Sequence, residues 1–281
     1  MLIDKPAGPT SHDVVARVRR VYGTRAVGHT GTLDPFATGL LVVLVGTATR
    51  LARFVEALPK TYWATVRLGV QTSTDDPTGE VIAVQEGKAA SVSEARVRAA
   101  LEEFVGRGMQ RPPVFSAKKV AGERSYRRAR RGEAVALAEV PVTVHRVELL
   151  SLAPPDLEFR ATVSAGTYVR ALARDLGERL ETGAHLTALR RESIGGLRVE
   201  AAVPLDRLEP TTPLLSPLAV LAHLPVLPLD AEEARAVRQG RLVRRGEGPP
   251  GPVALTFEHE LVAVGDREAG GIQPRVVLEG A

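Results

Sequence analysis

A cluster of prolines divides this chain of 281 residues into two parts of different texture. Because proline fixes φ and removes a backbone donor, a dense series of prolines interrupts helices and sheets alike. Beyond the cluster, short apolar segments alternate with glycine and proline, a texture typical of a small β-barrel. The pattern predicts a large domain over residues 1–205, a linker over 206–224 and a small domain over 225–281. The prolines are Pro204, Pro210, Pro213, Pro217, Pro225 and Pro228.

The first part mixes strand and helix patterns, which predicts an α+β domain. Residues 40–45 are a continuous aliphatic run, typical of a strand buried on both faces. Residues 62–70 alternate at the period of a strand, and 140–152 and 157–163 indicate two more, whereas 74–79 have the composition of a turn. Helices are predicted from a cap at Ser11 to Gly23, over 49–58, after a capping box at Ser91 and Glu94, and over 168–180.

Composition and charge narrow the classes of function. The chain has no cysteine, which excludes disulfides, thiolate catalysis and cysteine zinc sites. No apolar run approaches the roughly 18–20 residues of a membrane span. Residues 107–131 hold nine basic residues against one acidic residue, a charge of +8. Such clustering indicates a polyanion partner, nucleic acid above all, although a solvated basic face without a partner is the plain alternative.

Several familiar catalytic and cofactor patterns are absent from the sequence. The six histidines do not pair at metal-ligand spacing. No Gly-x-Ser-x-Gly elbow of a serine hydrolase occurs, and no phosphate-binding G-x-x-x-x-G-K-[ST] loop. Gly28-x-x-Gly31 lacks the flanking pattern of a dinucleotide fold. The chemistry therefore has to come from Asp, Glu, His, Tyr, Arg, Ser or Thr.

The octapeptide GHTGTLDP, residues 28–35, places one carboxylate in a constrained loop before the buried strand. Gly28 and Gly31 allow close backbone approach or positive φ, and Pro35 restricts Asp34 to extended conformations. A carboxylate held in this way acts as a nucleophile or base if a cation keeps it ionised, and arginine fits that need best. Aspartate is also common in plain turns, so the octapeptide alone leaves both interpretations open.

Ordered motifs from near Met1 to about residue 200 resemble one family, the TruB family of tRNA pseudouridine-55 synthases. Their order and spacing make the resemblance specific. Family members usually carry a short leader before the Asp-Lys-Pro motif, whereas this chain begins almost at that motif, so we expect a shortened first strand with the catalytic set intact. The matching stretches are DKPxGxTS from Asp4, GHTGTLDPxATGLL from Gly28, KTY from Lys60, PPVFSAKK from Pro112, SAGTYVR from Ser164 and HLTALRR from His185.

The resemblance assigns catalytic and pocket roles to residues at matching positions. Asp34 stands at the catalytic aspartate, and Arg170 at the arginine that pairs with it. Tyr62 stands at the tyrosine that stacks on the target base and is implicated in proton transfer. Tyr168 and Leu189 match residues that line the uridine pocket.

The resemblance also implies a set of RNA contacts. His29 matches the histidine that helps hold the flipped-out T-loop conformation, and Lys5 lies in a motif near the site whose role we treat as structural. The basic segment resembles a mobile insertion over about 107–135 that closes on the T loop, with Lys118, Arg127 and Arg128 among its predicted substrate contacts. Residues 225–281 resemble, more weakly, a PUA-like RNA-binding domain.

Taken together, the resemblance implies a cytoplasmic monomer that isomerises uridine 55 in the T loop of tRNA by base flipping. It implies no cofactor, no metal, no membrane and no protein partner. The expected fold is α+β, with a mixed, mostly antiparallel central sheet flanked by helices and a small C-terminal PUA-like β-barrel. Two alternatives stay open: an RNA-binding or RNA-folding module, and a glycosidase-like hydrolase, which normally needs a second catalytic carboxylate.

Overall fold

The structure is a computed structural model that describes residues 1–115, 119–120, 123–124, 137–245 and 247–278. It forms two compact units, and the chain passes between them more than once. The first unit comprises Met1–Leu33, Leu40–Ala57 and Gly195–Ala281, and the second comprises Asp34–Gly39 and Leu58–Ile194. The predicted catalytic residues Asp34, Tyr62 and Arg170 all lie in the second unit.

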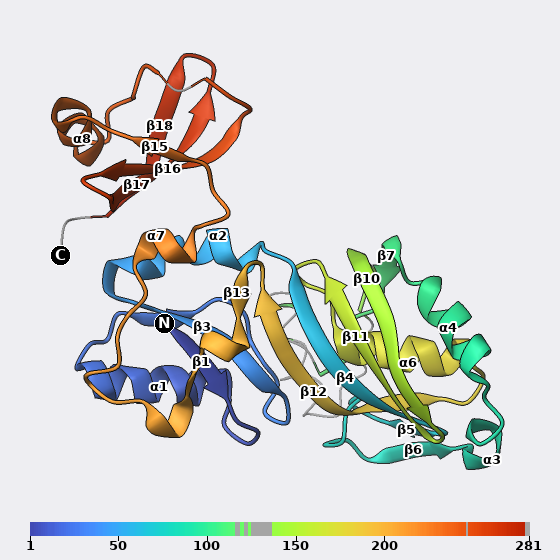
Figure 1. Cartoon of the computed structure of the whole chain (residues 1–281). Coiled ribbons are helices and arrows are strands. Elements are labelled where there is room, and N and C mark those ends of the chain that lie inside the picture. Colours follow the sequence, from blue (N-terminus) through green and yellow to red (C-terminus); the bar gives the residue numbers. More distant parts are fainter. Residues whose placement is uncertain (116–118, 121–122, 125–136, 246, 279–281) are drawn as a thin grey trace. The chain divides into compact units, whose positions relative to one another are not determined.

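The second unit is built on an antiparallel sheet. Its strands, in spatial order, are β12 (Ala184–Ile194), β4 (Lys60–Leu68), β11 (Asp156–Val163), β10 (Val140–Ala153) and β7 (Gly106–Gln110). At the β12 edge, the first two residues of β3 (Thr38–Val45) pair in parallel with β12. The helix α6 (Val169–Arg179) lies against β12 and β4 (Figure 1), and α4 (Glu94–Glu102) contacts β10 and α6. The predicted α+β class, with a mixed sheet flanked by helices, is confirmed.

The alternation predicted for β4 decides which side chains face α6. The buried side chains of the strand are Lys60, Tyr62, Ala64, Val66 and Leu68, and the residues between them are half-buried or exposed. Successive side chains of a strand point to opposite faces, so the buried set shares the face that α6 covers.

Gly177 allows α6 to approach the chain closely. A Cβ at this position would lie 2.3 Å from the amide nitrogen of Ala184, so a larger residue would push the helix off β12.

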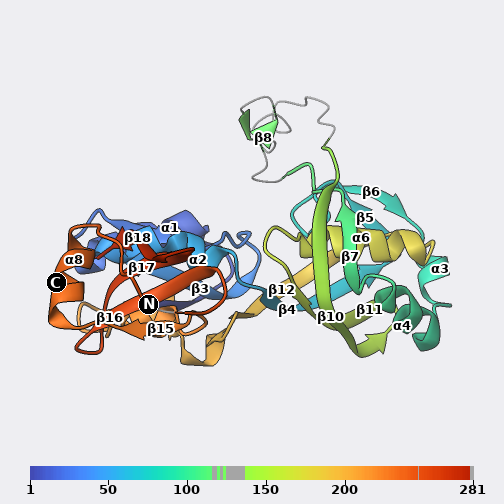
Figure 2. The ribbon, with the colours of Figure 1, turned by 90° about the horizontal axis from the view of Figure 1, so that it is seen from above.

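A hairpin beside α6 carries the turn predicted over residues 74–79. Its strands are β5 (Val70–Thr72) and β6 (Val81–Val84), followed by the short helix α3 (Glu86–Ala89). Figure 2 shows the hairpin next to α6. Within the basic segment, β8 (Lys119–Val120) and β9 (Glu123–Arg124) pair with each other.

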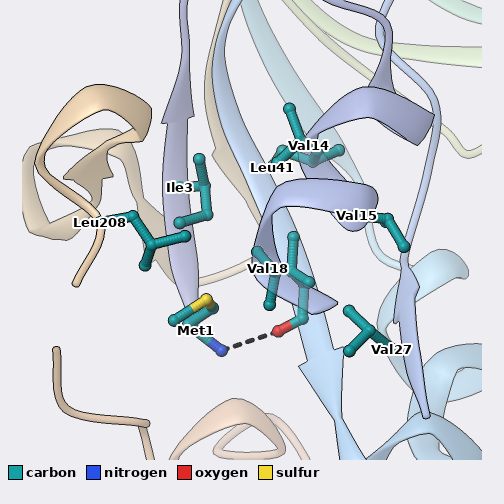
Figure 3. Packing of buried hydrophobic residues seen from close by; sticks show 9 residues of the cluster. Met1, Ile3, Val14, Val15, Val18, Val27, Leu41 and Leu208 are labelled. Atoms are coloured by element: carbon teal, nitrogen blue, oxygen red, sulfur yellow. Dashed lines mark hydrogen bonds between the residues drawn. The ribbon is translucent and has the colours of Figure 1, made fainter. Parts of the chain in front are cut away.

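In the first unit, a helix packs on a small sheet. The helix α1 (Ser11–Tyr22) covers strands β1 (Leu2–Lys5), β2 (Val27–His29) and the later part of β3, and β1 also pairs with β14 (Val203–Pro204). Three valines of α1 meet Met1, Ile3, Leu41 and Leu208 in one cluster, where the amine of Met1 donates to the carbonyl of Val43 at 2.8 Å (Figure 3). The burial of residues 40–44 on both faces confirms the predicted buried strand. Short elements complete this part: η1 (Gly46–Leu51), α2 (Ala52–Glu56), β13 (Leu197–Arg198), η2 (Val199–Ala201) and η3 (Leu205–Arg207).

The C-terminal part has a small apolar core of its own. Leu229, Ala234, Val237, Val253 and Val262 are among its buried residues. Its described strands form a four-stranded sheet in the order β15, β16, β17, β18, and within residues 225–245 and 247–278 the sheet does not close into a barrel. The elements are α7 (Pro217–Val220), β15 (Val226–Pro228), α8 (Ala231–Arg238), β16 (Gly251–Phe257), β17 (Glu260–Glu268) and β18 (Gly271–Val277).

Two predicted helix caps were wrong in position. The cap of α1 is Thr10, whose side chain accepts from the amide of Asp13 in a capping box, because the hydroxyl of Ser11 is buried and used elsewhere. The cap of α4 is Ser93, which accepts from the amide of Arg96. The region predicted as one helix over 49–58 is divided between the 3₁₀ turn η1 and the short α2. Among the described residues, no helix is long and apolar enough to cross a membrane.

Candidate active site

Asp34 and Arg170 form an ion pair in the second unit. The Nε atom of Arg170 lies 3.0 Å from Oδ2 of Asp34, and Nη2 donates to Oδ1 at 3.4 Å. The Arg170 side chain is 5% exposed, whereas that of Asp34 is 35% exposed. The arginine is therefore fixed inside the protein, and the carboxylate presents part of its surface to whatever binds there. The contact between Nε of Arg170 and Oδ2 of Asp34 is an ion pair, because the Nε–H is not aligned for a hydrogen bond.

The loop that carries Asp34 is held at both ends. Just before it, the hydroxyl of Ser11 accepts from the amide of Leu33 at 2.9 Å and donates to the carbonyl of Leu33 at 3.2 Å. Just after it, Gly39 pairs with Arg191 so closely that a Cβ would lie 2.3 Å from the Arg191 carbonyl oxygen. Gly39 also has φ of 101°, which favours glycine. These anchors account for the rigid carboxylate that the octapeptide predicted.

Arg170 uses its fork on several acceptors at once. Nη1 donates to the carbonyl of Thr74 at 3.0 Å and to Oδ2 of Asp76 at 3.1 Å. Nη2 donates to the carbonyl of Phe115 at 2.9 Å. Only a planar guanidinium presents donors in so many fixed directions, so lysine cannot replace it.

The start of α6, two residues before Arg170, is fixed by a buried amide. Gln110 at the end of β7 accepts from the amide of Tyr168 at 2.9 Å and donates to the carbonyl of Tyr168 at 3.1 Å. Because both ends of the Gln110 amide bind one backbone unit, they define where the helix begins.

Asp76 is a second carboxylate at the site, and both of its oxygens are engaged. Oδ2 binds Arg170, and the Asp76 side chain is 5% exposed. Oδ1 accepts from the hydroxyl of Thr74 at 2.6 Å, the amide of Thr78 at 2.9 Å and the hydroxyl of Thr78 at 2.5 Å. This is the arrangement of a carboxylate that orients the arginine.

A further ion cluster lies one helical turn along α6. Arg174 binds Asp75 across 3.2 Å and Asp175 across 2.7 Å. Burial raises the pKa of Asp75 to about 6, against the lowering by Arg174 and Arg170. Burial likewise raises the pKa of Asp175 above its ordinary value. Burial lowers the pKa of Arg174, but the negative charges of Asp175 and Asp75 outweigh burial, so the pKa of Arg174 is raised.

Tyr62, a predicted catalytic residue, and Leu189, a predicted pocket residue, lie on neighbouring strands of the sheet. Arg191 pairs with Gly39 on one side and with Tyr62 on the other, so Tyr62 stands two strands from the end of the Asp34 loop. Paired residues point to the same face. Leu189 pairs with Ala64, a neighbour of Tyr62 on that face, and Tyr62 and Leu189 are each 7% exposed. Both side chains therefore lie on the face that α6 covers, and Arg170 lies in the first turn of that helix.

The sequence matches one known protein family. A family model described as "TruB family pseudouridylate synthase (N terminal domain)" matches residues 19–169, more than half of the chain. The chain belongs to the TruB family. A TruB relative from Thermobifida fusca (strain YX), named tRNA pseudouridine synthase B, is 48% identical and aligns over 100% of this chain and 98% of its own. One of the same name from Synechococcus sp. (strain WH7803) is 44% identical over 99% and 96%.

Solved structures support the same fold for this TruB chain. A chain from the structure of an H/ACA RNP bound to a substrate RNA containing 2′-deoxyuridine matches with a TM-score of 0.74 and 24% identity, over 99% of this chain and 84% of its own. A chain from a Cbf5–Nop10–Gar1 complex matches with a TM-score of 0.71 and 27% identity, over 98% and 82%. At 24% identity, the likeness to the H/ACA RNP chain shows the fold alone.

The remaining predicted site residues of this TruB chain do not all lie in the second unit or among the described residues. Lys5 and His29 lie in the first unit. Lys5 is buried and donates to the carbonyls of Pro6 at 2.8 Å and Pro9 at 2.9 Å, so it shapes the loop before α1. The Nδ1 atom of His29 accepts from the amide of Gly31 at 3.3 Å. Three predicted contacts lie outside the described residues, namely Lys118, Arg127 and Arg128. Among the described residues, no group of three His, Asp or Glu side chains could hold a metal ion.

Sequence reasoning missed three residues that organise the site. Asp76 was interpreted only as part of a turn, although two adjacent aspartates in a Thr- and Gly-containing turn were a usable signal. Ser11 was assigned to the helix cap, but its hydroxyl holds the residue before Asp34. Gln110 carried no signal, because a lone glutamine at a strand end has no periodic pattern.

Proposed function

We propose that this chain isomerises uridine to pseudouridine at position 55 in the T loop of tRNA. The observation that carries the proposal is the partly exposed carboxylate of Asp34 held against the buried guanidinium of Arg170. It occurs in a chain whose full-length relatives are named tRNA pseudouridine synthase B. The reaction breaks the N1–C1′ bond of the nucleoside, turns the uracil and rejoins it through C5. Reactant and product are isomers, and the proposal assigns no cofactor and no metal.

In this proposal Asp34 is the reacting carboxylate. It either attacks the substrate covalently or removes a proton from the ribose to give a glycal intermediate. In both routes the carboxylate has to be ionised, and the nearby positive charge of Arg170 favours the ionised form. The contacts of Arg170 with Asp76 and with the Thr74 carbonyl keep that charge in place without rearrangement during the reaction.

Three residues are proposed to receive the uracil. Tyr62, on the covered face of β4, stacks on the base and takes part in the proton transfer at C5. Leu189 lines the same face, and Tyr168 stands at the start of α6 beside Arg170. The positions of the three residues support this assignment. Tyr62 and Leu189 share one face of the sheet, and the backbone of Tyr168 is fixed by Gln110.

Extrusion of a uridine from a folded T arm costs a few kcal/mol of unstacking. Phosphate contacts offset that cost, and we assign them to the insertion over about 107–135, with Lys118, Arg127 and Arg128. His29 is assigned to the flipped loop and Lys5 to the shape of the loop before α1. We further propose a linker at 206–224, a PUA-like RNA-binding domain at 225–281, and a monomer that acts in the cytoplasm.

Release of tritium from a tRNA transcript labelled at C5 of uridine tests the activity and its position. The wild-type protein should release about one tritium per transcript, and a transcript with cytidine at position 55 should release none. Release that persists from the cytidine transcript would move the reaction to another uridine. No release from either transcript would leave an RNA-binding or RNA-folding module as the better account.

The alternative function is a hydrolase that frees uracil. It needs a second carboxylate, and the fold places Asp76 beside Arg170. Asp76 does not suit the task of activating water. Oδ1 of Asp76 already accepts three hydrogen bonds, and Oδ2 faces Arg170 in a buried position. The isomerase is therefore favoured, and chromatography of the reaction mixture should show no free uracil.

The basic insertion has a separate test. Neutralising Arg127, Arg128, Arg130 and Arg131 together should weaken tRNA binding and reduce the slope of log Kd against log salt by up to about 4, one per lost phosphate contact. An unchanged slope would remove these residues from the phosphate contacts and leave the assignment of Asp34 intact.

A further inference from the structure

Two arginines on α6 bind adjacent residues of one turn. Arg170 donates to the carbonyl of Thr74 at 3.0 Å and to Asp76 at 3.1 Å. Arg174 binds the side chain of Asp75 across 3.2 Å. Residues four apart lie on the same face of a helix. The turn is therefore attached to α6 by two arginines, and the proposed reaction uses only the first of them.

Asp75 has a backbone conformation that residues other than glycine rarely adopt. Its φ is 59°, in the left-handed region, where a Cβ is unfavourable and glycine is not. Such a conformation persists where surrounding contacts enforce it. Its carbonyl accepts from the amide of Leu186 at 3.1 Å, and its side chain is held by Arg174. The reversal at Asp75 lets two consecutive carboxylates reach two different arginines.

We propose that Arg174 is a positioning residue for the isomerisation, acting through Asp75 to hold the turn that orients Arg170 against Asp34. The inference rests on the proposed function. Arg174 itself binds Asp75, Asp175 and the carbonyl of Arg111. Its effect passes from Arg174 to Asp75, along the backbone to Thr74 and Asp76, and from these to Arg170.

The surroundings of Asp75 make its carboxylate depend on Arg174. The Asp75 side chain is 15% exposed and that of Arg174 is 19% exposed. Burial raises the pKa of Asp75 to about 6, and the positive charge of Arg174 is the largest of the effects that lower this pKa. Without Arg174, Asp75 would have to take up a proton or turn outward. Turning outward would remove the left-handed reversal that places Asp76.

Arg174 has a second route to the site that a test has to separate from the first. It donates to the carbonyl of Arg111 at 2.9 Å, and it lines a cavity of about 270 Å³ together with Arg111 and Glu139. These two residues flank the segment 112–138. An effect of Arg174 on that segment would alter tRNA binding, whereas an effect through Asp75 would alter the chemical step.

Glycine substitution at position 75 distinguishes the two routes. Arg174→Gln should slow single-turnover tritium release at least about tenfold, since displacements of about 1 Å cost up to about 100-fold, with Kd for tRNA within about twofold of wild type. Asp75→Ala should show a similar loss. Asp75→Gly keeps the left-handed backbone without an ion pair and should stay within about threefold of wild type. Above all, Asp75→Gly should restore the rate of Arg174→Gln.

Asp175→Asn removes another partner of Arg174 without touching the turn, and it should react at close to the wild-type rate. A wild-type rate in Arg174→Gln would overturn the proposal, and so would failure of Asp75→Gly to restore it. If Arg174→Gln does not fold, equal rates in Asp75→Ala and Asp75→Gly would overturn it. Failure of the proposed function is distinguishable, because the wild-type protein itself would then release no tritium.

Discussion

The guanidinium of Arg170 and the carboxylate of Asp34 lie 3.0 Å apart, although 136 residues separate them in the chain. Each comes from a segment with its own anchors: Ser11 and Gly39 on the side of Asp34, and Gln110 and Asp76 on the side of Arg170. The pair is therefore held in place by contacts within the fold. Preorganised charge of this kind needs no rearrangement during the reaction.

Replacement of Arg170 by lysine should lower the single-turnover rate of tritium release roughly 100-fold. Lysine keeps the charge but reaches only one acceptor, whereas Arg170 binds Asp34, Asp76 and two carbonyls. Arg160→Lys is a matched control, because Arg160 makes a two-pronged contact with Glu192 at an exposed position. The control should react at the wild-type rate. Equal rates in the two variants would show that the fork of Arg170 is dispensable.

Asp76→Ala should lower the free energy of unfolding by about 3–5 kcal/mol, because it leaves the buried Arg170 with one partner fewer. Urea denaturation measures the change. The matched control is Asp156→Ala, which breaks the exposed ion pair with Arg67. That pair should be worth about 1 kcal/mol or less. A loss in Asp76→Ala no larger than in the control would contradict the bracing role of Asp76.

Gln110→Glu should destabilise the protein by about 2 kcal/mol and slow the reaction. A carboxylate can accept from the amide of Tyr168 but cannot donate to its carbonyl, 3.1 Å away, so two oxygens would face each other in a buried place. Gln273→Glu is the control, since Gln273 donates to the carbonyl of Gly240 at an exposed position. If both variants unfold at the same urea concentration as wild type, Gln110 does not define the start of α6.

The raised pKa of Asp75 predicts a pH dependence of stability. Its ordinary value is 3.8, and burial raises the pKa to about 6 in the folded protein. Between these values the folded protein binds this proton more tightly than the unfolded chain does. The free energy of unfolding should therefore fall as pH rises through this window, by roughly 3 kcal/mol at most.

Comparison with Asp75→Asn isolates this effect from the other carboxyl groups. The unfolding free energy of Asp75→Asn minus that of wild type, from urea titrations at pH 4 to 7, should increase with pH and level off above about pH 6. A difference that is constant, or that decreases with pH, would mean that Asp75 is not held in a desolvated position.

The sequence was sufficient for features that have a periodic or motif signal. The aliphatic run at 40–45 and the alternation of β4 correctly predicted buried strands. The family motifs pointed to Asp34 and Arg170, which lie together in the structure. Features that depend on three-dimensional contacts were not predictable. The use of Ser11 on Leu33, rather than in the helix cap, depends on a segment 22 residues away.

The role of Asp76 shows the same limit more sharply. Its turn was predicted, but a turn pattern does not show that its carboxylate faces an arginine 94 residues later. Gln110 is a comparable case, because its partner is the backbone of Tyr168, which has no residue-specific signature. The predicted barrel at 225–281 rested on spacing of short strands, and spacing does not determine closure: its described strands form an open four-stranded sheet.

Single-turnover tritium release by Asp34→Asn, measured together with tRNA binding, shows whether Asp34 is the reacting carboxylate. Asparagine keeps the size of the side chain but removes the charge that faces Arg170. If Asp34 is that carboxylate, tRNA binds Asp34→Asn with a Kd within a few-fold of wild type while tritium release is abolished. Undiminished release by a folded, tRNA-binding Asp34→Asn protein would contradict this role.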